Sequence, residues 1–216
     1  MSDITVSKEV IRRLPRYYRY LEELMGEGIE RISSKELSLM MKVTDSQIRQ
    51  DLNRFGGFGR TGYGYNVPAL HEEIGKILGL DKIKHIILIG AGNLGQALAN
   101  YTNYRRRGFC IDAIFDRDPE KIGSTVYGIT VQDIAGLEDY IASNDVDIAT
   151  LTIPKGEARL VAKRLSDSGV KAIWNFAHTD LDLPEDVVVE NVHLSESLMR
   201  LSYRVKEQRK GNGEQS

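Results

Sequence analysis

The clearest feature of the hydrophobic pattern is a run of four apolar residues, 86–89, followed at once by a glycine-rich segment. A short continuous apolar run is typical of a buried strand in a parallel sheet. Residues 96–100, after the glycines, fit a helix that we expect to begin near Asn93. The pattern therefore predicts a strand, a tight turn and a helix in direct succession.

The glycines of that turn follow the order Gly-x-Gly-x-x-Gly, and each has a physical task in nucleotide binding. Gly90 permits the tight turn, Gly92 lets a pyrophosphate approach the backbone, and Gly95 lets the helix pack closely on the strand. The first N–H groups of the helix would face that pyrophosphate. The alternative is a strand–turn–helix unit that merely tolerates glycine. The loop residues of the predicted dinucleotide site are Gly90, Ala91, Gly92, Asn93, Leu94 and Gly95.

A second predicted strand, 109–115, ends on Asp116, about twenty residues beyond the last glycine. A carboxylate at this place can accept both hydroxyls of an adenosine ribose and would repel a 2′-phosphate. The sequence therefore favours NAD over NADP, although Arg117 could accommodate such a phosphate. The alternative for Asp116 is a turn residue at the end of the strand.

Helical and strand patterns alternate through the rest of this half, which predicts a doubly wound parallel sheet of the Rossmann type. The expected helices and strands are 137–142, 147–153, 158–165, 170–174 and 187–192. Ligands bind at the carboxyl ends of strands in such sheets. This adds four candidate cofactor contacts, Thr152, Pro154, Asn175 and Phe176.

The chain ends in one more helical pattern, which we expect Ser195 to cap. Leu198, Leu201 and Val205 share one face of it, its far end is basic, and residues 211–216 should be disordered.

The first helical pattern covers residues 10–24 and contains Pro15, which either kinks the helix or begins a new turn. Its basic side chains are Arg12, Arg13, Arg16 and Arg19. They form either a solvated face or contacts to phosphate or to another domain. We take Arg12 and Arg16 as candidate DNA contacts.

Two capping-box patterns follow, Ser33 with Glu36 and Thr44 with Gln47, and together they predict a helix–turn–helix. In the second helix, one face is apolar through Ile48, Leu52 and Phe55. The other face carries small, amide and guanidinium side chains, the types that read base edges in the major groove. These candidates are Ser46, Gln47, Arg49, Gln50 and Asn53. An ordinary polar surface helix is the alternative.

Glycines and aromatic residues alternate over 56–65 around a single arginine, Arg60. The pattern predicts a hairpin with Arg60 near its tip. A hairpin after a recognition helix is a wing, and its arginine can enter a narrow A·T-rich minor groove. A helix from Val67 to Gly79 should then link the two domains.

Composition narrows the function without naming it. The 216 residues are 41% hydrophobic and 28% charged with a net charge of −2, so any basic DNA-binding face must be local. Cys110, the single cysteine, excludes a disulfide framework within the chain, and we expect it in a buried strand. The sequence has no apolar run of membrane length and no signal-peptide core. We therefore expect no membrane association and a cytoplasmic protein. No histidine or cysteine cluster has metal-ligand spacing.

The chain resembles the Rex family of redox-sensing transcriptional repressors from about Ile11 to Val205. The motifs that carry the resemblance are Arg13-Leu14-Pro15-x-Tyr17-Tyr18-Arg19-Tyr20-Leu21, Arg49-x-Asp51-Leu52 with Phe55-Gly56, Gly62-x-Gly64-Tyr65-x-Val67, Gly90-x-Gly92-Asn93-Leu94-Gly95, Phe115-Asp116-x-Asp118-Pro119-x-Lys121-Ile122-Gly123 and Ala172-Ile173-Trp174-Asn175-Phe176-Ala177.

This resemblance implies a homodimer that represses transcription from an inverted-repeat operator on double-stranded DNA and reads the NADH/NAD⁺ ratio, NADH binding causing release. It implies four parts: a winged-helix DNA-binding domain (1–80), a Rossmann NAD(H)-binding domain (81–193), a dimerisation helix swapped between subunits (194–210) and a tail (211–216). It also implies a switch made by Arg19 and Tyr101, with Tyr101 close to the cofactor. Their family partner is an aspartate, where this chain has His193.

Two other functions remain open from the sequence. One is an NAD-dependent oxidoreductase with an accessory helix–turn–helix, in which His178 is the best candidate for a general acid or base. The other is a winged-helix regulator that binds coenzyme A or another adenylate. We expect a regulator and not an enzyme.

Overall fold

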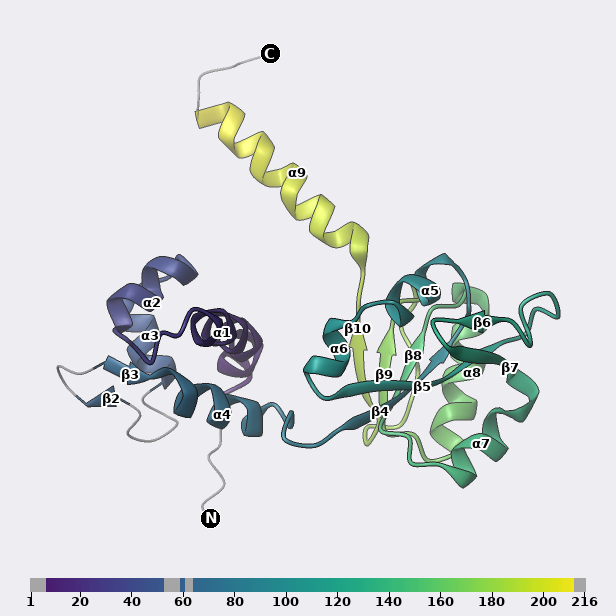
Figure 1. The fold of residues 1–216 in the computed structure, drawn as a ribbon. Coiled ribbons are helices and arrows are strands. Elements are labelled where there is room, and N and C mark those ends of the chain that lie inside the picture. The colour runs from purple at the N-terminus through teal and green to yellow at the C-terminus, as the bar shows by residue number, and fades with distance from the viewer. Residues whose placement is uncertain (1–6, 53–58, 61–63, 212–216) are drawn as a thin grey trace. The chain divides into compact units, whose positions relative to one another are not determined.

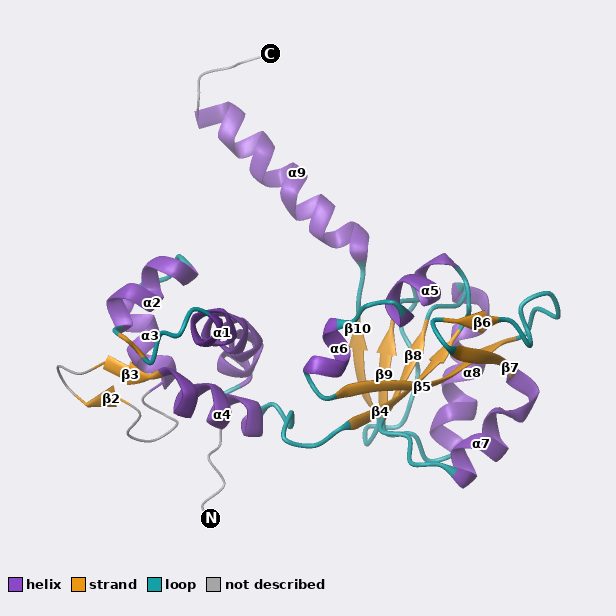
Figure 2. Cartoon of the chain, in the orientation of Figure 1, coloured by secondary structure: helices purple, strands orange, loops and turns teal. Residues whose placement is uncertain are grey.

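The computed structural model describes residues 7–52, 59–60 and 64–211, and the chain divides into two compact units (Figures 1 and 2). The first unit is Met1–Lys82 and the second is Ile83–Ser216. Of the helices that the structure describes, none combines the length and the apolar character that a bilayer span requires.

The first unit has the predicted helix–turn–helix and hairpin. Its helices are α1 (Lys8–Gly26), α2 (Ser34–Met41), α3 (Asp45–Leu52) and α4 (Val67–Ile77). Its antiparallel sheet has the order β1-β3-β2, formed by β1 (Arg31–Ile32), β2 (Gly59–Arg60) and β3 (Gly64–Asn66). Arg60 pairs with Gly64 next to the hairpin tip, as predicted. The tip itself, together with Asn53 and Phe55, lies outside the described residues.

Local capping explains where the short helices begin. Ser33 and Glu36 form the full predicted capping box at α2. At α3 only half of the predicted box forms, because Thr44 accepts from the Gln47 N–H while the Gln47 side chain binds Asp51 instead. Asn66 caps α4 by accepting from the Ala69 N–H. α1 continues through Pro15 as one helix.

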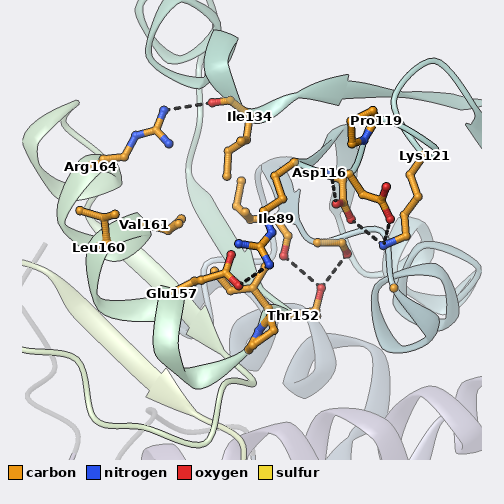
Figure 3. A pocket seen from close by; sticks show the side chains of 16 residues that line it. Ile89, Asp116, Pro119, Lys121, Ile134, Thr152, Glu157, Leu160, Val161 and Arg164 are labelled. Carbon is orange, nitrogen blue, oxygen red and sulfur yellow. Dashed lines mark hydrogen bonds and ion pairs between the residues drawn. The ribbon is translucent and has the colours of Figure 1, made fainter.

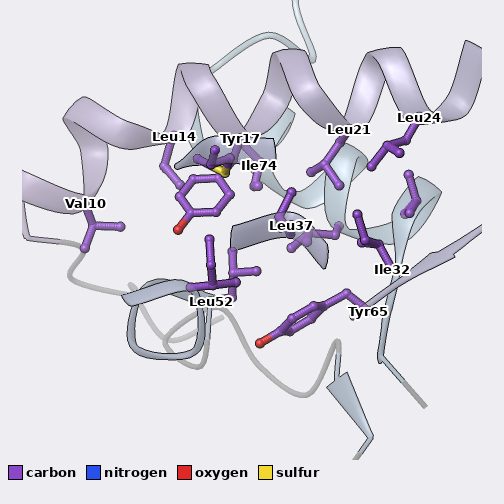
Figure 4. Close-up of a cluster of buried hydrophobic side chains, with 14 residues drawn as sticks. Val10, Leu14, Tyr17, Leu21, Leu24, Ile32, Leu37, Leu52, Tyr65 and Ile74 are labelled. Carbon is purple, nitrogen blue, oxygen red and sulfur yellow. The ribbon is translucent and has the colours of Figure 1, made fainter. Parts of the chain in front are cut away.

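One apolar core holds the first unit together (Figure 4). α1 contributes Leu14, Tyr17 and Leu21, which are fully buried and recur at helical spacing. They pack against residues from α2, α3, α4 and the small sheet, among them Leu37 and Ile74. The helix–turn–helix is therefore fixed on α1 and cannot be an isolated pair of helices.

A buried carboxylate joins α1 to α3. Asp51, 1% exposed, accepts two hydrogen bonds of 2.7 Å from Arg13, one of 2.9 Å from the Tyr17 hydroxyl and one of 2.8 Å from Gln47. Burial raises the pKa of Asp51, but the hydrogen bonds from Arg13, Gln47 and Tyr17 outweigh it, so this pKa lies below its ordinary value. The orientation of α3 therefore depends on an ionised, fully satisfied side chain.

The second unit is a Rossmann-type sheet with the order β10-β9-β8-β4-β5-β7-β6. Its strands are β4 (Lys84–Ile89), β5 (Phe109–Asp116), β6 (Thr125–Val126), β7 (Ile129–Asp133), β8 (Ile148–Leu151), β9 (Ala172–Asn175) and β10 (Val188–Asn191). The pairs of the sheet are parallel except β6 with β7. β4 therefore lies at the centre, where the strand order reverses.

Helices cover both faces of this sheet. They are α5 (Asn93–Ala99), α6 (Asn103–Arg106), η2 (Ile134–Gly136), α7 (Leu137–Ser143) and α8 (Lys155–Asp167). The last helix, α9 (Leu194–Gly211), extends away from the sheet, and its described side chains are exposed (Figure 1). Ile87 and Ile89 of β4 pack toward α7 and α8, and Leu88 packs toward α5. Neighbouring residues of β4 thus face opposite layers, which explains its unbroken apolar run.

Some details of this unit differ from the prediction. The sequence did not predict the β6–β7 hairpin or α6, because each is too short to give a periodic signal. α9 begins at Leu194, so Ser195 lies inside the helix, and it includes Gly211 of the expected disordered tail; residues 212–216 lie outside the described residues. Cys110 is half-buried and not buried, because only the second half of β5 lies under the helices.

We expect Asp51→Asn to lower the free energy of unfolding of the first unit by about 2 kcal/mol at pH 7, since Arg13 and Tyr17 lose a charged acceptor. A depressed carboxyl pKa stabilises the fold above the unfolded value of about 3.9, and this contribution disappears as pH falls through the folded pKa. Urea unfolding followed by circular dichroism should therefore show a difference at pH 7 that shrinks near pH 3.

Tyr17→Phe is the matched control, because it removes one hydrogen bond and keeps the carboxylate; we expect a loss of about 1 kcal/mol. Trp174, the single tryptophan, lies in the second unit and reports its unfolding separately. Equal unfolding of wild type and Asp51→Asn at pH 7 would show that the buried carboxylate does not stabilise this unit.

Candidate functional site

The glycine loop between β4 and α5 has the close packing that its sequence predicts. A Cβ on Gly95 would lie 2.0 Å from the Gly90 carbonyl oxygen and 2.9 Å from the Thr152 hydroxyl. Gly90 has φ of 107°, and a Cβ there would lie 2.8 Å from the Thr152 carbonyl oxygen. Both positions therefore require glycine for the fold itself.

Gly92 is different, because nothing in the described chain crowds it. It lies at the N-cap of α5 with φ of −76°, which any residue can adopt, and a Cβ there would meet no described atom within 4 Å. The fold leaves open the side of the loop where the first N–H groups of α5 begin. A pyrophosphate lying against the backbone would use that space.

Thr152 holds the loop from the end of β8. Its hydroxyl lies 2.8 Å from the Gly90 carbonyl oxygen and 3.1 Å from that of Ile89. The strand order explains the contact, since β8 pairs directly with β4 and both strands end at the same edge. Thr152, a predicted cofactor contact, therefore stabilises the turn between β4 and α5 through its hydroxyl.

Asp116, at the end of β5, is 8% exposed and ionised. Its carboxylate accepts from the Ala91 N–H at 2.7 Å and the Asp118 N–H at 2.9 Å, and Lys121 lies 3.4 Å away. Burial raises the pKa of Asp116, but these backbone donors and the Lys121 charge lower it further, so the pKa lies below its ordinary value. The Oδ2 atom already accepts from both the Ala91 N–H and Lys121, whereas Oδ1 accepts only from the Asp118 N–H among the described residues and can still accept a hydroxyl.

These residues surround a cavity of about 820 Å³ at the carboxyl edge of the sheet (Figure 3). Of the predicted cofactor residues it brings together Gly90, Gly92, Asp116, Arg117, Thr152 and Pro154. A cavity of this size, with apolar walls and a few fixed polar groups, suits a nucleotide.

Each cation that lines this cavity within the described chain has a carboxylate partner. Arg117 lies 3.0 Å from Glu157, Lys121 lies 3.4 Å from both Asp116 and Asp118, and Arg164 lies 2.6 Å from Glu138. The cavity therefore offers an anion backbone N–H groups, and its positive side chains are already paired.

Other predicted residues lie elsewhere. Ala91 donates to Asp116, while Asn93, Leu94 and Gly95 form the first turn of α5 outside the cavity lining.

The predicted contacts beyond the loop also lie outside this cavity. Asn175 is fully buried and bound to Thr179, Asn191 and Ala177, and Phe176 packs on Trp174. Tyr101 is exposed, packs edge-on to Tyr104 and lines a separate cavity of about 290 Å³.

The cavity also has residues that sequence reasoning missed. They are Ile89, Asp118, Pro119, Lys121, Ile134, Ile153, Glu157, Leu160, Val161 and Arg164. Those of α8 recur at positions i, i+3, i+4 and i+7, which is a detectable signal for one helix face. The sequence gives no sign of which way that face points.

On the first unit, the predicted recognition side chains occur on the outer side of α3. Ser46, Arg49 and Gln50 are exposed, whereas Ile48 and Leu52 are buried. Arg49 forms an ion pair with Asp45, and Gln47 donates to Asp51 at 2.8 Å. Arg49 and Gln47 are therefore held by carboxylates of their own helix.

The arginines of α1 have distinct surroundings. Arg12 is exposed, and Arg16 donates to the Met41 carbonyl at the end of α2, so it supports that helix. Arg19 lies 3.9 Å from Glu23 and over the Tyr20 ring. In the second unit, His193 lies against His178, with ring centroids 5.8 Å apart.

Two family models match the chain, one for each unit. Residues 5–53 match a putative DNA-binding protein N-terminus, and residues 81–179 match a CoA binding domain. The first contains α1 to α3, and the second contains the glycine loop and all the residues that line the cavity.

Individual relatives cover nearly the whole chain. The redox-sensing transcriptional repressors Rex of Thermoanaerobacter sp. (strain X514) and Clostridioides difficile (strain 630) are each 57% identical over 94% of this chain, and over 91% and 96% of their own lengths. Among solved structures, RSP, a Rex-family repressor, is similar in complex with β-NAD⁺ and operator DNA (TM-score 0.89, 55% identity) and with β-NADH (TM-score 0.88, 53% identity). Both matches cover 98% of this chain and 99% of the other. The chain therefore belongs to the Rex family of redox-sensing transcriptional repressors.

Proposed function

We propose that this chain is a transcriptional repressor that senses the NADH/NAD⁺ ratio, binds an inverted-repeat operator as a homodimer and leaves it when NADH binds. The observation that carries the proposal is the match, over 98% of the chain, to a repressor solved both with operator DNA and with NADH. A regulator of this kind is not an enzyme, and we propose that it acts in the cytoplasm, where its operator DNA lies.

The second unit would hold the dinucleotide at the described cavity. The start of α5 and Gly92 would face the pyrophosphate, and Asp116 would accept the adenosine ribose hydroxyls. NAD(H) supplies no chemistry here beyond its two redox states, because it acts as a ligand. Arg117 is paired with Glu157, which supports NAD(H) over NADP(H).

The predicted contacts to the nicotinamide half of the cofactor lie outside the lining of the cavity. Asn175 and Phe176 stay predictions as cofactor contacts, and so does Tyr101, since none of them lines it. The switch formed by Arg19, Tyr101 and His193 also stays a prediction from the family resemblance.

The first unit would bind the operator through α3 and the β2–β3 hairpin. Ser46, Gln47, Arg49 and Gln50 lie on α3 and would read base edges, with Asn53 the next expected contact along the chain. Arg60 would enter the minor groove and Arg12 would contact phosphate, whereas Arg16 would act through its bond to Met41.

The exposed face of α9 supports a homodimer. Leu194, Leu198, Leu201 and Val205 recur on one side of this helix and are all exposed in the single chain. Such an apolar stripe is typical of a helix that packs against a partner. We propose that it packs on a second subunit, as the family resemblance implies.

The coupling of cofactor to DNA needs only a difference in affinity. A ligand shifts a two-state equilibrium by the ratio of its affinities for the two states. A hundredfold preference of NADH for the form that cannot bind the operator supplies about 2.7 kcal/mol. Half-sites lie about one DNA turn apart, so a change in the spacing of the two recognition helices is enough for release.

We expect NADH to release the purified protein from a palindromic operator fragment while excess NAD⁺ does not. The measurement is fluorescence anisotropy of labelled operator titrated with NADH at fixed NAD⁺. Coenzyme A and NADPH are the competing ligands, because the second unit also matches a CoA binding domain. Operator affinity that is unchanged at millimolar NADH would contradict the proposal.

Alanine substitutions in the glycine loop should separate folding from cofactor binding. We expect Gly92→Ala to leave the melting temperature of the second unit unchanged and to weaken NADH binding at least tenfold, because the added methyl occupies the space for the pyrophosphate. Gly95→Ala should instead lower the melting temperature, because its Cβ meets the Gly90 carbonyl. Calorimetry with NADH and thermal unfolding followed by Trp174 fluorescence measure the two effects. Wild-type NADH affinity in Gly92→Ala would place the pyrophosphate elsewhere.

Arg60→Ala should weaken operator binding and reduce the slope of log K against log salt by about one, since one phosphate or minor-groove contact is lost. NADH affinity should not change, because Arg60 belongs to the first unit. Binding titrations from 50 to 200 mM salt, roughly the range where such slopes are read, test this. An unchanged slope would make the hairpin a scaffold without DNA contact.

A further inference from the structure

The ion pair on the outer side of α3 joins the exposed arginine of this helix to a carboxylate one turn earlier. The Arg49 Nη1 group donates to the Asp45 Oδ2 atom, and the side chains are 50% and 36% exposed. Both residues lie on the proposed recognition helix; Arg49 is exposed, whereas Asp45 is half-buried and its Oδ1 atom is out of reach of solvent. An isolated exposed pair of this type contributes little to stability, so its geometric effect on Arg49 is the larger consequence.

Asp45 is well suited to hold a guanidinium. It lies in the first turn of α3, where the helix dipole favours a negative charge, and it precedes its basic partner by four residues, which is the favourable order. The Ser34 hydroxyl and the Arg49 guanidinium lower the pKa of Asp45, so it is ionised at neutral pH.

The pair limits what Arg49 can do. One end of the guanidinium is bound through Nη1, and the remaining N–H groups keep the planar fork that matches the O6 and N7 acceptors of guanine. A free arginine on a helix surface would reach any nearby phosphate, which carries no sequence information. A carboxylate beside it opposes that by repelling phosphate and by fixing the side chain.

Gln47 shows the same arrangement on the neighbouring turn. Its amide donates to Asp51 at 2.8 Å, and Asp51 is itself fixed by Arg13 and Tyr17. Two carboxylates of α3, Asp51 and Asp45, thus hold Gln47 and Arg49, two of its long polar side chains.

We propose that Asp45 is a specificity-determining positioning residue, which holds the Arg49 guanidinium for a guanine in the major groove of the operator. The proposal rests on the proposed DNA-binding function of α3. It predicts that Asp45 lowers affinity for DNA in general and raises the preference for the operator.

Asp45→Asn tests this in the full-length protein, by anisotropy titrations with the operator and with a scrambled duplex of equal composition. We expect affinity for the scrambled duplex to rise and the operator-to-scrambled ratio to fall about tenfold. Single base-pair substitutions through one half-site should show one G·C pair at which wild type discriminates at least tenfold and Asp45→Asn does not.

Two controls separate positioning from charge and from folding. Glu27→Gln makes the same change of net charge at an exposed site outside α3, and we expect it to keep the base-pair profile of wild type. In an Arg49→Ala background, Asp45→Asn should no longer change that profile, because Asp45 acts through Arg49.

An unchanged profile in Asp45→Asn would overturn the proposal, and so would an equal loss of affinity at every base pair, which is the result of a structural role alone. If wild type binds operator and scrambled duplex equally, the proposed repressor function fails instead. The two failures are therefore distinguishable in one set of titrations.

Discussion

The nucleotide half of this protein depends on one close approach, that of α5 to the end of β4. Gly90 and Gly95 have no side chains, so α5 can begin directly at the end of β4. The Thr152 hydroxyl, from the end of β8, hydrogen-bonds to the Gly90 carbonyl and stabilises the turn. A side chain at Gly95 would meet a backbone carbonyl, which cannot move without displacing the strand. The position of the first N–H groups of α5, and with it the proposed place for a pyrophosphate, follows from this backbone contact and needs no side chain.

In each unit an ionised carboxylate also joins a candidate binding element to its neighbour. Asp116 joins the loop to β5 by accepting from Ala91, and Asp51 joins α3 to α1 by accepting from Arg13 and Tyr17. A buried carboxylate is costly unless its oxygens are saturated with donors, and both have several. In each case the charge sets the geometry of a candidate binding element, so these residues fix where that element lies.

The sequence predicted the features that arise from local chemistry. β4, α5, the helix–turn–helix and the strand-end position of Asp116 follow from periodicity, caps and glycine spacing within about thirty residues. The failures concern side chains whose partners lie far away or compete with the predicted one. Gln47 binds Asp51 and not the backbone of Thr44. Asn175, whose cofactor contact stays a prediction, binds Thr179 in the turn after β9 and Asn191 at the end of β10. Arg13 reads as one of four similar arginines until the fold places Asp51, 38 residues away in sequence, beside it.

The ion pairs of the cavity bear on the choice between NAD(H) and NADP(H), for which Arg117 left an alternative open in the sequence. Arg117 was ambiguous because a cation beside the ribose carboxylate can accept a 2′-phosphate. In the structure Glu157, from α8, lies 3.0 Å from it, and the ionised Asp116 carries negative charge to the same edge. A 2′-phosphate would have to displace Glu157 from Arg117 and approach a second carboxylate, with both costs absent for a ribose hydroxyl. The proposed preference for NAD(H) over NADP(H) therefore rests on α8 as much as on the strand end, so the residues around Asp116 alone do not determine it.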